Sequence, residues 1–211
     1  MKSLSIVFAC LLIVSCSQSR PGNIGVYMLV DTSGTYSEEI QKAQQIIRYT
    51  LSRLDAKDTF AVARIDTASF SEKDIVAKIT LDDRPTTMNR QKRLFADQVQ
   101  VFVDQSPSSA YTDITGGLLQ AVEYLNEKQP AKKTVFIFSD LKEDLEDGYI
   151  REIDFDLDGF EIVALNVTKL RTDNVDPREY LTRLDEWQNK VESSGGRWRV
   201  INDLDGLERL L

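Results

Sequence analysis

Residues 25–35 read GVYMLVDTSGT, and this stretch decides the fold. Its first half, from Gly25 to Val30, is a continuous apolar run, which is the pattern of a strand buried on both faces of a sheet. The run ends at Asp31, and a short turn rich in hydroxyl side chains follows. The sequence therefore predicts a central strand that delivers a carboxylate and several hydroxyls to its carboxyl end.

Strand and helix patterns alternate along the rest of the chain. Further strands are expected at Thr59–Ile65, Ile75–Leu81, Thr134–Phe138, Phe160–Val167 and Trp198–Ile201. Helices are expected at Tyr36–Leu54, 87–104, Thr112–Lys128, from Pro177 to about Ser193 after Asp176 as N-cap, and at Asp203–Leu211.

The order of these elements predicts the fold class. The segment between Ile65 and Ile75 is too short for a helical crossover, so we expect the strands on either side to pair as an antiparallel hairpin. The other strands alternate with helices, which is typical of parallel pairing. We therefore expect an α/β fold with a doubly wound, mostly parallel sheet, one antiparallel edge strand and helices on both faces.

The composition excludes several kinds of chemistry. The chain has 211 residues, the length of one domain, and a net charge of −8. So acidic a chain is expected to offer no dense Lys/Arg face and to have no nucleic-acid partner. It has no histidine, and both cysteines, Cys10 and Cys16, lie in its first sixteen residues. The folded body therefore has no His-ligated zinc site, thiol or disulfide, and its function must use carboxylate, hydroxyl and amine groups.

Residues 1–16, MKSLSIVFACLLIVSC, have the pattern of an export signal. The apolar run that follows Lys2 is shorter than the roughly 20 residues of a membrane-spanning helix and fits the hydrophobic region of a signal peptide. Its end, Ile13–Cys16, resembles the bacterial lipobox. The resemblance implies cleavage after Ser15 and acylation of Cys16. An ordinary signal peptide that is cut nearby is the alternative.

The expected organisation follows from this resemblance. We expect a lipoprotein signal peptide at 1–15, the lipidated cysteine and a polar tether at 16–23, and one domain at 24–211. Several acyl chains hold a protein durably on a membrane, whereas one chain is marginal. The expected location is the bacterial cell envelope, facing the periplasm or the cell surface.

Acidic residues end two strands that should be neighbours. In a doubly wound sheet, ligands bind at the carboxyl ends of the strands where the winding reverses. Here that point lies between the first strand and Thr134–Phe138, and the first acidic residues after these two strands are Asp31 and Asp140. We therefore expect two carboxylates in one crevice.

The turn after the first strand resembles the metal-ion-dependent adhesion site of von Willebrand factor A domains. That site combines Asp-x-Ser-x-Ser after the first strand, a threonine in a later loop and an aspartate after the fourth strand. The matching positions are Asp31, Ser33, Thr35 (where serine is usual), Thr112 and Asp140. Leu141 departs from the glycine that often follows the last aspartate. The resemblance covers about residues 23–211.

The resemblance implies a divalent cation held by these five side chains. Mg²⁺ is expected, with Mn²⁺ or Ca²⁺ as alternatives, because oxygen donors suit hard cations and argue against zinc or copper. It also implies that an Asp or Glu side chain of a partner protein completes the coordination. The chain is therefore expected to be a membrane-anchored binding module and not an enzyme.

Each motif alone has a simpler interpretation. DTSGT is also typical of a strand-to-helix turn, Thr112 of a helix cap and Asp140 of a turn. Other acidic residues, among them Asp113 and Glu143, are expected on the solvated surface.

Two further functions stay open. MLVDTSGT also resembles the first motif of haloacid-dehalogenase phosphatases, with Asp31 as the nucleophile and Ser139 as the second-motif hydroxyl. However, Ser33 stands at the general-acid position and cannot deliver a proton as a carboxylic acid does. The other alternative is a metal-free structural subunit of an envelope complex, since Thr35 and Leu141 depart from the commonest metal-site pattern.

Overall fold

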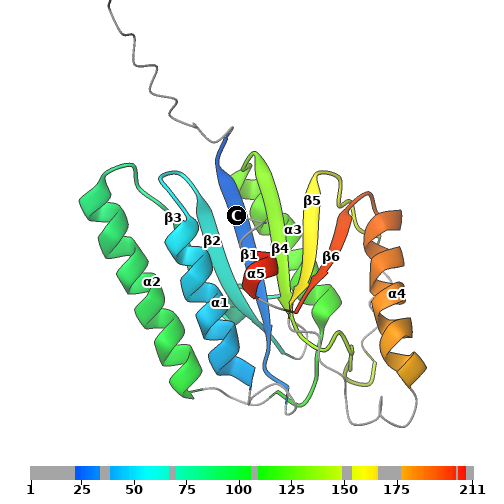
Figure 1. The fold of residues 1–211 in the computed structure, drawn as a ribbon. Coiled ribbons are helices and arrows are strands. Elements are labelled where there is room, and N and C mark those ends of the chain that lie inside the picture. Colours follow the sequence, from blue (N-terminus) through cyan, green and yellow to red (C-terminus); the bar gives the residue numbers. More distant parts are fainter. Residues whose placement is uncertain are drawn as a thin grey trace, which may run out of the picture.

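The computed structural model has a central sheet with helices on both faces (Figure 1). It describes residues 22–33, 39–66, 70–105, 109–148, 154–165, 177–202 and 204–207. The predicted signal peptide at 1–15 and Cys16 lie outside these residues, as does Thr35. None of the helices in the described ranges is long and apolar enough to span a membrane.

The sheet has six strands in the order β3-β2-β1-β4-β5-β6. Their bounds are β1 Ile24–Asp31, β2 Thr59–Ile65, β3 Ile75–Thr80, β4 Lys132–Phe138, β5 Phe160–Leu165 and β6 Arg197–Ile201. Neighbouring strands are parallel except for β2 and β3, which are antiparallel. The predicted doubly wound sheet with one antiparallel edge strand is confirmed.

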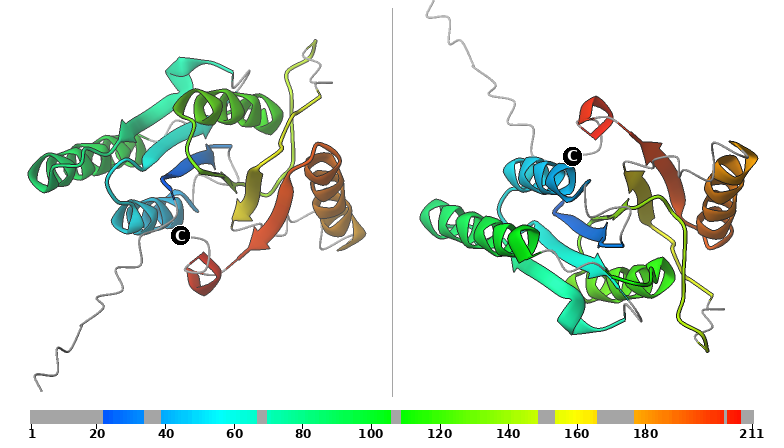
Figure 2. Two further views of the ribbon diagram at one scale, coloured as in Figure 1. Left: turned by 90° about the horizontal axis from the view of Figure 1, so that it is seen from above. Right: turned by 90° about the horizontal axis from the view of Figure 1, so that it is seen from below.

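The helices divide between the two faces of the sheet. Their bounds are α1 Ile40–Arg53, α2 Pro85–Gln105, α3 Ile114–Lys128, α4 Pro177–Ser193 and α5 Leu204–Leu207, with a 3₁₀ turn, η2, at Glu72–Asp74. Seen along the sheet, α1, α2 and α5 lie on one side and α3 and α4 on the other (Figure 2). The predicted start of α4 at Pro177 is confirmed, whereas the predicted start at Tyr36, the predicted cap Asp176 and the predicted end at Leu211 lie outside the described residues.

Burial explains why β1 is central. Its alternate residues enter two separate hydrophobic clusters, Val26 and Met28 on the side of α1, and Tyr27 and Leu29 on the side of α3. All four are fully buried. Among the described residues, both clusters begin at or after Ile24. A chain that starts at residue 17 therefore retains the whole described core.

The carboxyl ends of the parallel strands meet at one edge, the lower edge in Figure 1. Val30 of β1 lies opposite Phe138 of β4, so Asp31 and Ser139 follow at the same level. The chain leaves β1 toward α1 on one face, whereas it reaches β4 from α3 on the other. This is the reversal of winding at which ligands bind in open α/β sheets.

Candidate metal site at the carboxyl edge of the sheet

Asp31 is the centre of the candidate site. Only 1% of its surface is exposed. Oδ1 accepts a hydrogen bond from the backbone N–H of Ser33 at 2.8 Å, and Oδ2 accepts one from the hydroxyl of Ser139 at 2.7 Å. The carboxylate is thus fixed in direction by the turn that follows β1 and by the end of the neighbouring strand.

Ser139 bonds to Asp31 at this edge, although the metal-site motif does not include it. Its side chain is fully buried, and its Oγ also accepts the backbone N–H of Leu141 at 3.0 Å. One hydroxyl therefore joins the ends of β1 and β4 and shapes the turn that carries Asp140. The available signal was its place directly before Asp140 at a strand end.

Asp140 lies on that turn with 4% of its surface exposed. Its Oδ1 accepts the backbone N–H of Lys142 at 2.8 Å. The next residue, Leu141, has a φ of 67°, a left-handed conformation that glycine adopts without steric cost. This explains physically why glycine would suit position 141. In this chain Leu141 is instead held by burial, with 2% of its surface exposed.

Burial raises the cost of ionising both carboxylates. Burial raises the pKa of Asp31 above its ordinary value, and the hydrogen bonds from Ser33 and Ser139 oppose that rise. Burial also raises the pKa of Asp140, and the negative charge of Asp31 raises it further. A cation placed between the two would stabilise both ionised forms.

The loop that carries Thr112 is tied to both strand ends. The backbone N–H of Ser109 donates to the carbonyl of Thr32 at 3.0 Å. Thr112 exchanges two backbone hydrogen bonds with Asp144, of 2.7 and 3.0 Å, beyond the Asp140 turn. Thr112 itself is buried, with 4% of its surface exposed. The loop is therefore fixed against the β1 end on one side and the Asp140 turn on the other.

The start of α3 corrects two expectations. The helix begins at Ile114, not Thr112, because the side chain of Asp113 is the N-cap and accepts the N–H of Gly116 at 2.7 Å. Asp113 is consequently buried and not a solvated surface residue. Glu143 is also engaged, since its Oε1 accepts the N–H of Thr115 at 2.6 Å.

Glycine at position 117 brings α3 close to the site. A Cβ added to Gly117 would lie 2.9 Å from a methyl carbon of Leu29 in β1. A side chain there would force either the fully buried Leu29 or the helix to shift. Glycine at position 117 therefore has a packing reason.

Three side chains of helix α4 bond to the segments around the candidate site. Arg183 donates from Nε to the carbonyl of Asp140 at 3.3 Å, and Trp187 donates from Nε1 to the carbonyl of Leu141 at 3.0 Å. One turn further on, Lys190 donates to Oγ1 of Thr115 at 2.6 Å and lies 3.8 Å from Glu143. These three side chains share one stripe of α4, and they hold the Asp140 turn and the first turn of α3 together.

The geometry brings together most of the predicted metal-site residues. Asp31, Ser33 and Asp140 share the β1–β4 edge, and Thr112 lies on the loop tied to that edge. Thr35 lies outside the described residues. Both oxygens of Asp31 accept protein hydrogen bonds, which fits a carboxylate that contacts Mg²⁺ through water, since Mg²⁺ dehydrates reluctantly.

Carboxylates alone do not make up a cation site in the described part of the chain. No cluster of three or more His, Cys, Asp or Glu side chains suited to a metal is found there. The proposed donor set has two carboxylates and takes its other ligands from neutral hydroxyls. It therefore does not require a cluster of three or more His, Cys, Asp or Glu side chains.

Comparison with known proteins gives the fold a name. A von Willebrand factor type A protein from Catenulispora acidiphila superposes with a TM-score of 0.53 at 13% sequence identity, over 89% of this chain and 40% of that chain. The fold is von Willebrand factor A-like. The pilus adhesin SpaC from Lactobacillus rhamnosus GG, in its open conformation, gives a TM-score of 0.54 at 12% identity, over 92% of this chain and 29% of that chain.

The same von Willebrand factor A-like fold extends to a protein of another kind. The human COPII-coat protein Sec24c matches with a TM-score of 0.50 at 8% identity, over 86% of this chain and 30% of that chain. This chain spans less than half the length of each of these three solved chains. No family model and no curated protein matches the sequence. At these identities the likeness establishes the fold alone.

Proposed function

We propose that this chain is a binding module of the von Willebrand factor A type, which captures a partner protein through a divalent cation. Asp31, Ser33, Thr35, Thr112 and Asp140 would hold the cation, and an Asp or Glu of the partner would complete its coordination. The observation that carries the proposal is the pair of buried carboxylates at the switch point, each with a raised pKa. Buried like charges favour a bound cation.

Each residue has a defined part in this proposal. Asp31 and Asp140 supply negative charge, while the hydroxyls of Ser33, Thr35 and Thr112 are neutral oxygen donors. Mg²⁺ bound to such a set keeps net positive charge and offers a position for one more anionic oxygen. Ser139, Arg183 and Trp187 act on the site only by positioning, since they bond to Asp31 or to the backbone of the Asp140 turn.

Burial argues against the phosphatase alternative. A nucleophilic carboxylate needs an oxygen that can reach substrate, but Asp31 is 1% exposed and both of its oxygens accept hydrogen bonds within the chain. Ser33 also lacks the acidic proton that the reaction needs. We therefore propose binding and not catalysis.

The proposed anchor suits the proposed site. Strand β1 begins at Ile24, at the edge of the sheet opposite the carboxyl ends (Figure 1). A tether from an acylated Cys16 would join the domain at that opposite edge, and the cation site would face away from the attachment point. This orientation leaves the site accessible to a partner in the envelope.

The test is capture of envelope proteins by immobilised residues 17–211 in Mg²⁺, followed by elution with EDTA. We expect one or more proteins to elute with EDTA, and we expect Asp140→Ala to abolish their capture. Asp156→Ala, which removes an exposed carboxylate outside the site, is the matched control and should capture normally. Capture that survives both EDTA and Asp140→Ala would overturn the cation-bridged mechanism.

A further inference from the structure

One face of this acidic protein is basic. Helix α1 and the first half of α2 (85–96) contain lysines and arginines but no Asp or Glu. The basic residues of this surface, here called the α1–α2 face, are Lys42, Arg48, Arg53, Arg90, Lys92 and Arg93. All are exposed except Lys92, which is half-buried. The expectation that so acidic a chain has no dense Lys/Arg face is therefore wrong.

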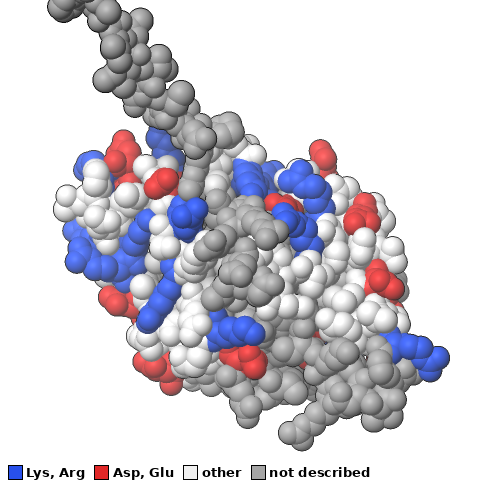
Figure 3. Space-filling view, in the orientation of Figure 1, with Lys and Arg blue, Asp and Glu red and all other residues white. Residues whose placement is uncertain are grey.

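The two helices form one continuous surface. They pack side by side on the same side of the sheet, and Figure 3 shows Lys and Arg atoms gathered over them, with acidic atoms chiefly at the borders. A groove of about 370 Å³ runs between them, and Arg48, Lys92 and Arg93 line it. Asp97 is the acidic residue in its lining.

Polar contacts hold these cations at the groove and leave them charged. Arg48 donates to Oε1 of Gln100 at 2.9 Å, and Lys92 donates to the carbonyl of Leu54 at 2.6 Å. Both acceptors are neutral, so neither contact cancels the positive charge. Gln44 donates to the same oxygen of Gln100 at 2.8 Å, which ties α1 to α2 across the groove.

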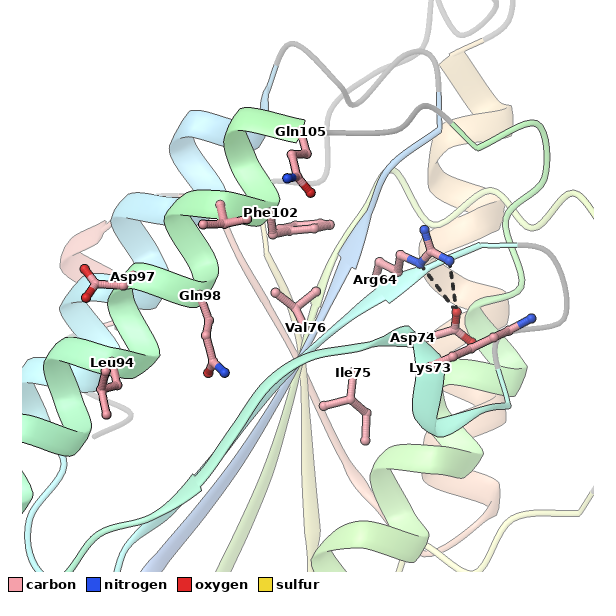
Figure 4. A pocket seen from close by; sticks show the side chains of 11 residues that line it. Arg64, Lys73, Asp74, Ile75, Val76, Leu94, Asp97, Gln98, Phe102 and Gln105 are labelled. Atoms are coloured by element: carbon pink, nitrogen blue, oxygen red, sulfur yellow. Dashed lines mark hydrogen bonds and ion pairs between the residues drawn. The ribbon is translucent and has the colours of Figure 1, made fainter.

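Two exposed aliphatic side chains lie on α2: Leu94 follows Arg93 in the sequence, and Val101 lies one helical turn after the exposed Asp97. Leu94 and Val101, two helical turns apart, are 58% and 52% exposed. They line a second groove, of about 690 Å³, between α2 and β3, in which Figure 4 shows Phe102 and Val76 as further apolar walls. Cations together with exposed aliphatic residues on one helix are typical of helices that lie at a membrane interface.

We propose that the α1–α2 face docks on the phosphate headgroups of an anionic phospholipid bilayer. Arg and Lys pair with phosphate oxygens through charged hydrogen bonds, and anionic surfaces attract such clusters. A nucleic acid would also complement the charge, but among the described residues α1 and α2 present no exposed aromatic side chain on which bases could stack. Leu94 and Val101 instead favour contact with lipid.

This inference is independent of the cation site and of acylation at Cys16. Asp31 and Asp140 lie at the carboxyl ends of β1 and β4, whereas the basic residues of the α1–α2 face belong to α1 and α2. Partner capture and lipid docking can therefore fail separately, and a chain without an acyl group can test the docking.

The test is flotation of residues 17–211 with phosphatidylcholine vesicles that contain or lack phosphatidylglycerol. This chain has 25 Lys and Arg against 34 Asp and Glu, since the removed segment contains only Lys2 of the 26, and its net charge is −9. A protein of that charge is repelled by an anionic surface unless its charges are segregated. We expect flotation only with the anionic vesicles, and loss of flotation at high salt.

Paired substitutions identify the surface. Arg48→Gln with Arg93→Gln should lower the affinity for anionic vesicles by about fivefold or more for each charge removed, the scale of one cation at such a surface. Lys78→Gln with Arg178→Gln removes the same charge from exposed positions away from this face and should change the affinity little. Thermal unfolding of each variant checks that the fold is intact.

Three results would overturn the proposal. They are equal flotation with and without phosphatidylglycerol, equal loss of affinity in the two double variants, and displacement by inorganic phosphate at the concentration of the headgroups, which would indicate a free-phosphate site. Binding to duplex DNA or RNA in the absence of any vesicle binding would likewise assign the face to a nucleic acid.

Discussion

At the scale of single residues, the raised pKa values of Asp31 and Asp140 make stability depend on pH. A carboxyl group whose pKa is higher in the folded than in the unfolded protein contributes most while it is protonated. That contribution is lost as pH rises from the ordinary value of 3.8 through the raised one. Burial is the largest cause for both groups, and the negative charge of Asp31 raises the pKa of Asp140 further.

This linkage predicts the behaviour of Asp140→Asn. In EDTA at neutral pH, the variant should be more stable than the wild type by on the order of 1 kcal/mol, because it removes one of two buried like charges. The difference should vanish at acidic pH and reverse when Mg²⁺ is added to the wild type. Urea unfolding across the pH range measures it, and parallel stability curves for the two proteins would contradict it.

Ser139 gives a second prediction at this scale. Ser139→Ala leaves Oδ2 of Asp31 and the N–H of Leu141 without the hydroxyl that bonds to both. We expect a loss of about 1–3 kcal/mol in the free energy of unfolding, the cost of unsatisfied buried groups. Ser52→Ala, which removes an exposed hydroxyl bonded to the carbonyl of Tyr49, should cost little. Equal losses of unfolding free energy in the two variants would show that the Ser139 hydroxyl does not stabilise this edge of the sheet.

Residue types and spacing predicted Asp31, Ser33 and Asp140 at one edge, because a strand end fixes where its last side chain lies. They did not predict Ser139 or the burial of Asp113. Those depend on which loops fold over the edge, and the capping bond from Gly116 to Asp113 becomes visible only when α3 is in place. Short-range pattern carries no information about such burial.

At the scale of elements, α4 controls the shape of the Asp140 turn. Trp187→Phe keeps an aromatic ring in the core but removes the N–H that bonds to the carbonyl of Leu141. We expect it to cost about 1 kcal/mol of stability and to weaken cation binding at the site. Trp198→Phe, at a half-buried position on β6, is the matched control. Titration with Mn²⁺ measures the effect, and an unchanged affinity in Trp187→Phe would show that α4 does not position the turn.

The periodicity of the sequence predicted the existence of these elements better than their contacts. It placed the hairpin of β2 and β3 correctly, because a short connection excludes a crossover. It placed α4 but could not show that Arg183 and Trp187 bond to the Asp140 turn and that Lys190 bonds to the first turn of α3. Which residues this stripe contacts depends on where α4 packs beside the sheet.

At the scale of the whole molecule, connection rules predicted the doubly wound sheet with its antiparallel edge, but the net charge did not show how charge is distributed over the surface. The chain is acidic overall, yet α1 and α2, which are separated in sequence by a hairpin, place their cations on one face. A sum over the sequence cannot reveal such segregation. Only the fold shows which charged residues share a face.

The proposed anchor predicts where the protein fractionates. Cys16→Ala should release the protein from membranes after a high-salt wash, because the wash removes electrostatic contacts of the α1–α2 face and the substitution removes the acyl attachment. The wild type should stay with the membranes under the same wash. The measurement is the amount of each protein in the washed membrane fraction and in the soluble extract. A variant that stays with the membranes after the high-salt wash would exclude Cys16 as the anchor.

The proposed binding mechanism is that Asp31 and Asp140 hold a cation whose coordination a carboxylate from outside completes. Its most direct test is the loss of the free Mn²⁺ signal in electron paramagnetic resonance when residues 17–211 are added, with acetate present as the outside carboxylate. We predict that the wild type and the control Asp156→Ala bind Mn²⁺ more tightly with acetate than without it, and that Asp31→Asn combined with Asp140→Asn does not bind. Equal Mn²⁺ binding by the double variant and the wild type would contradict the account.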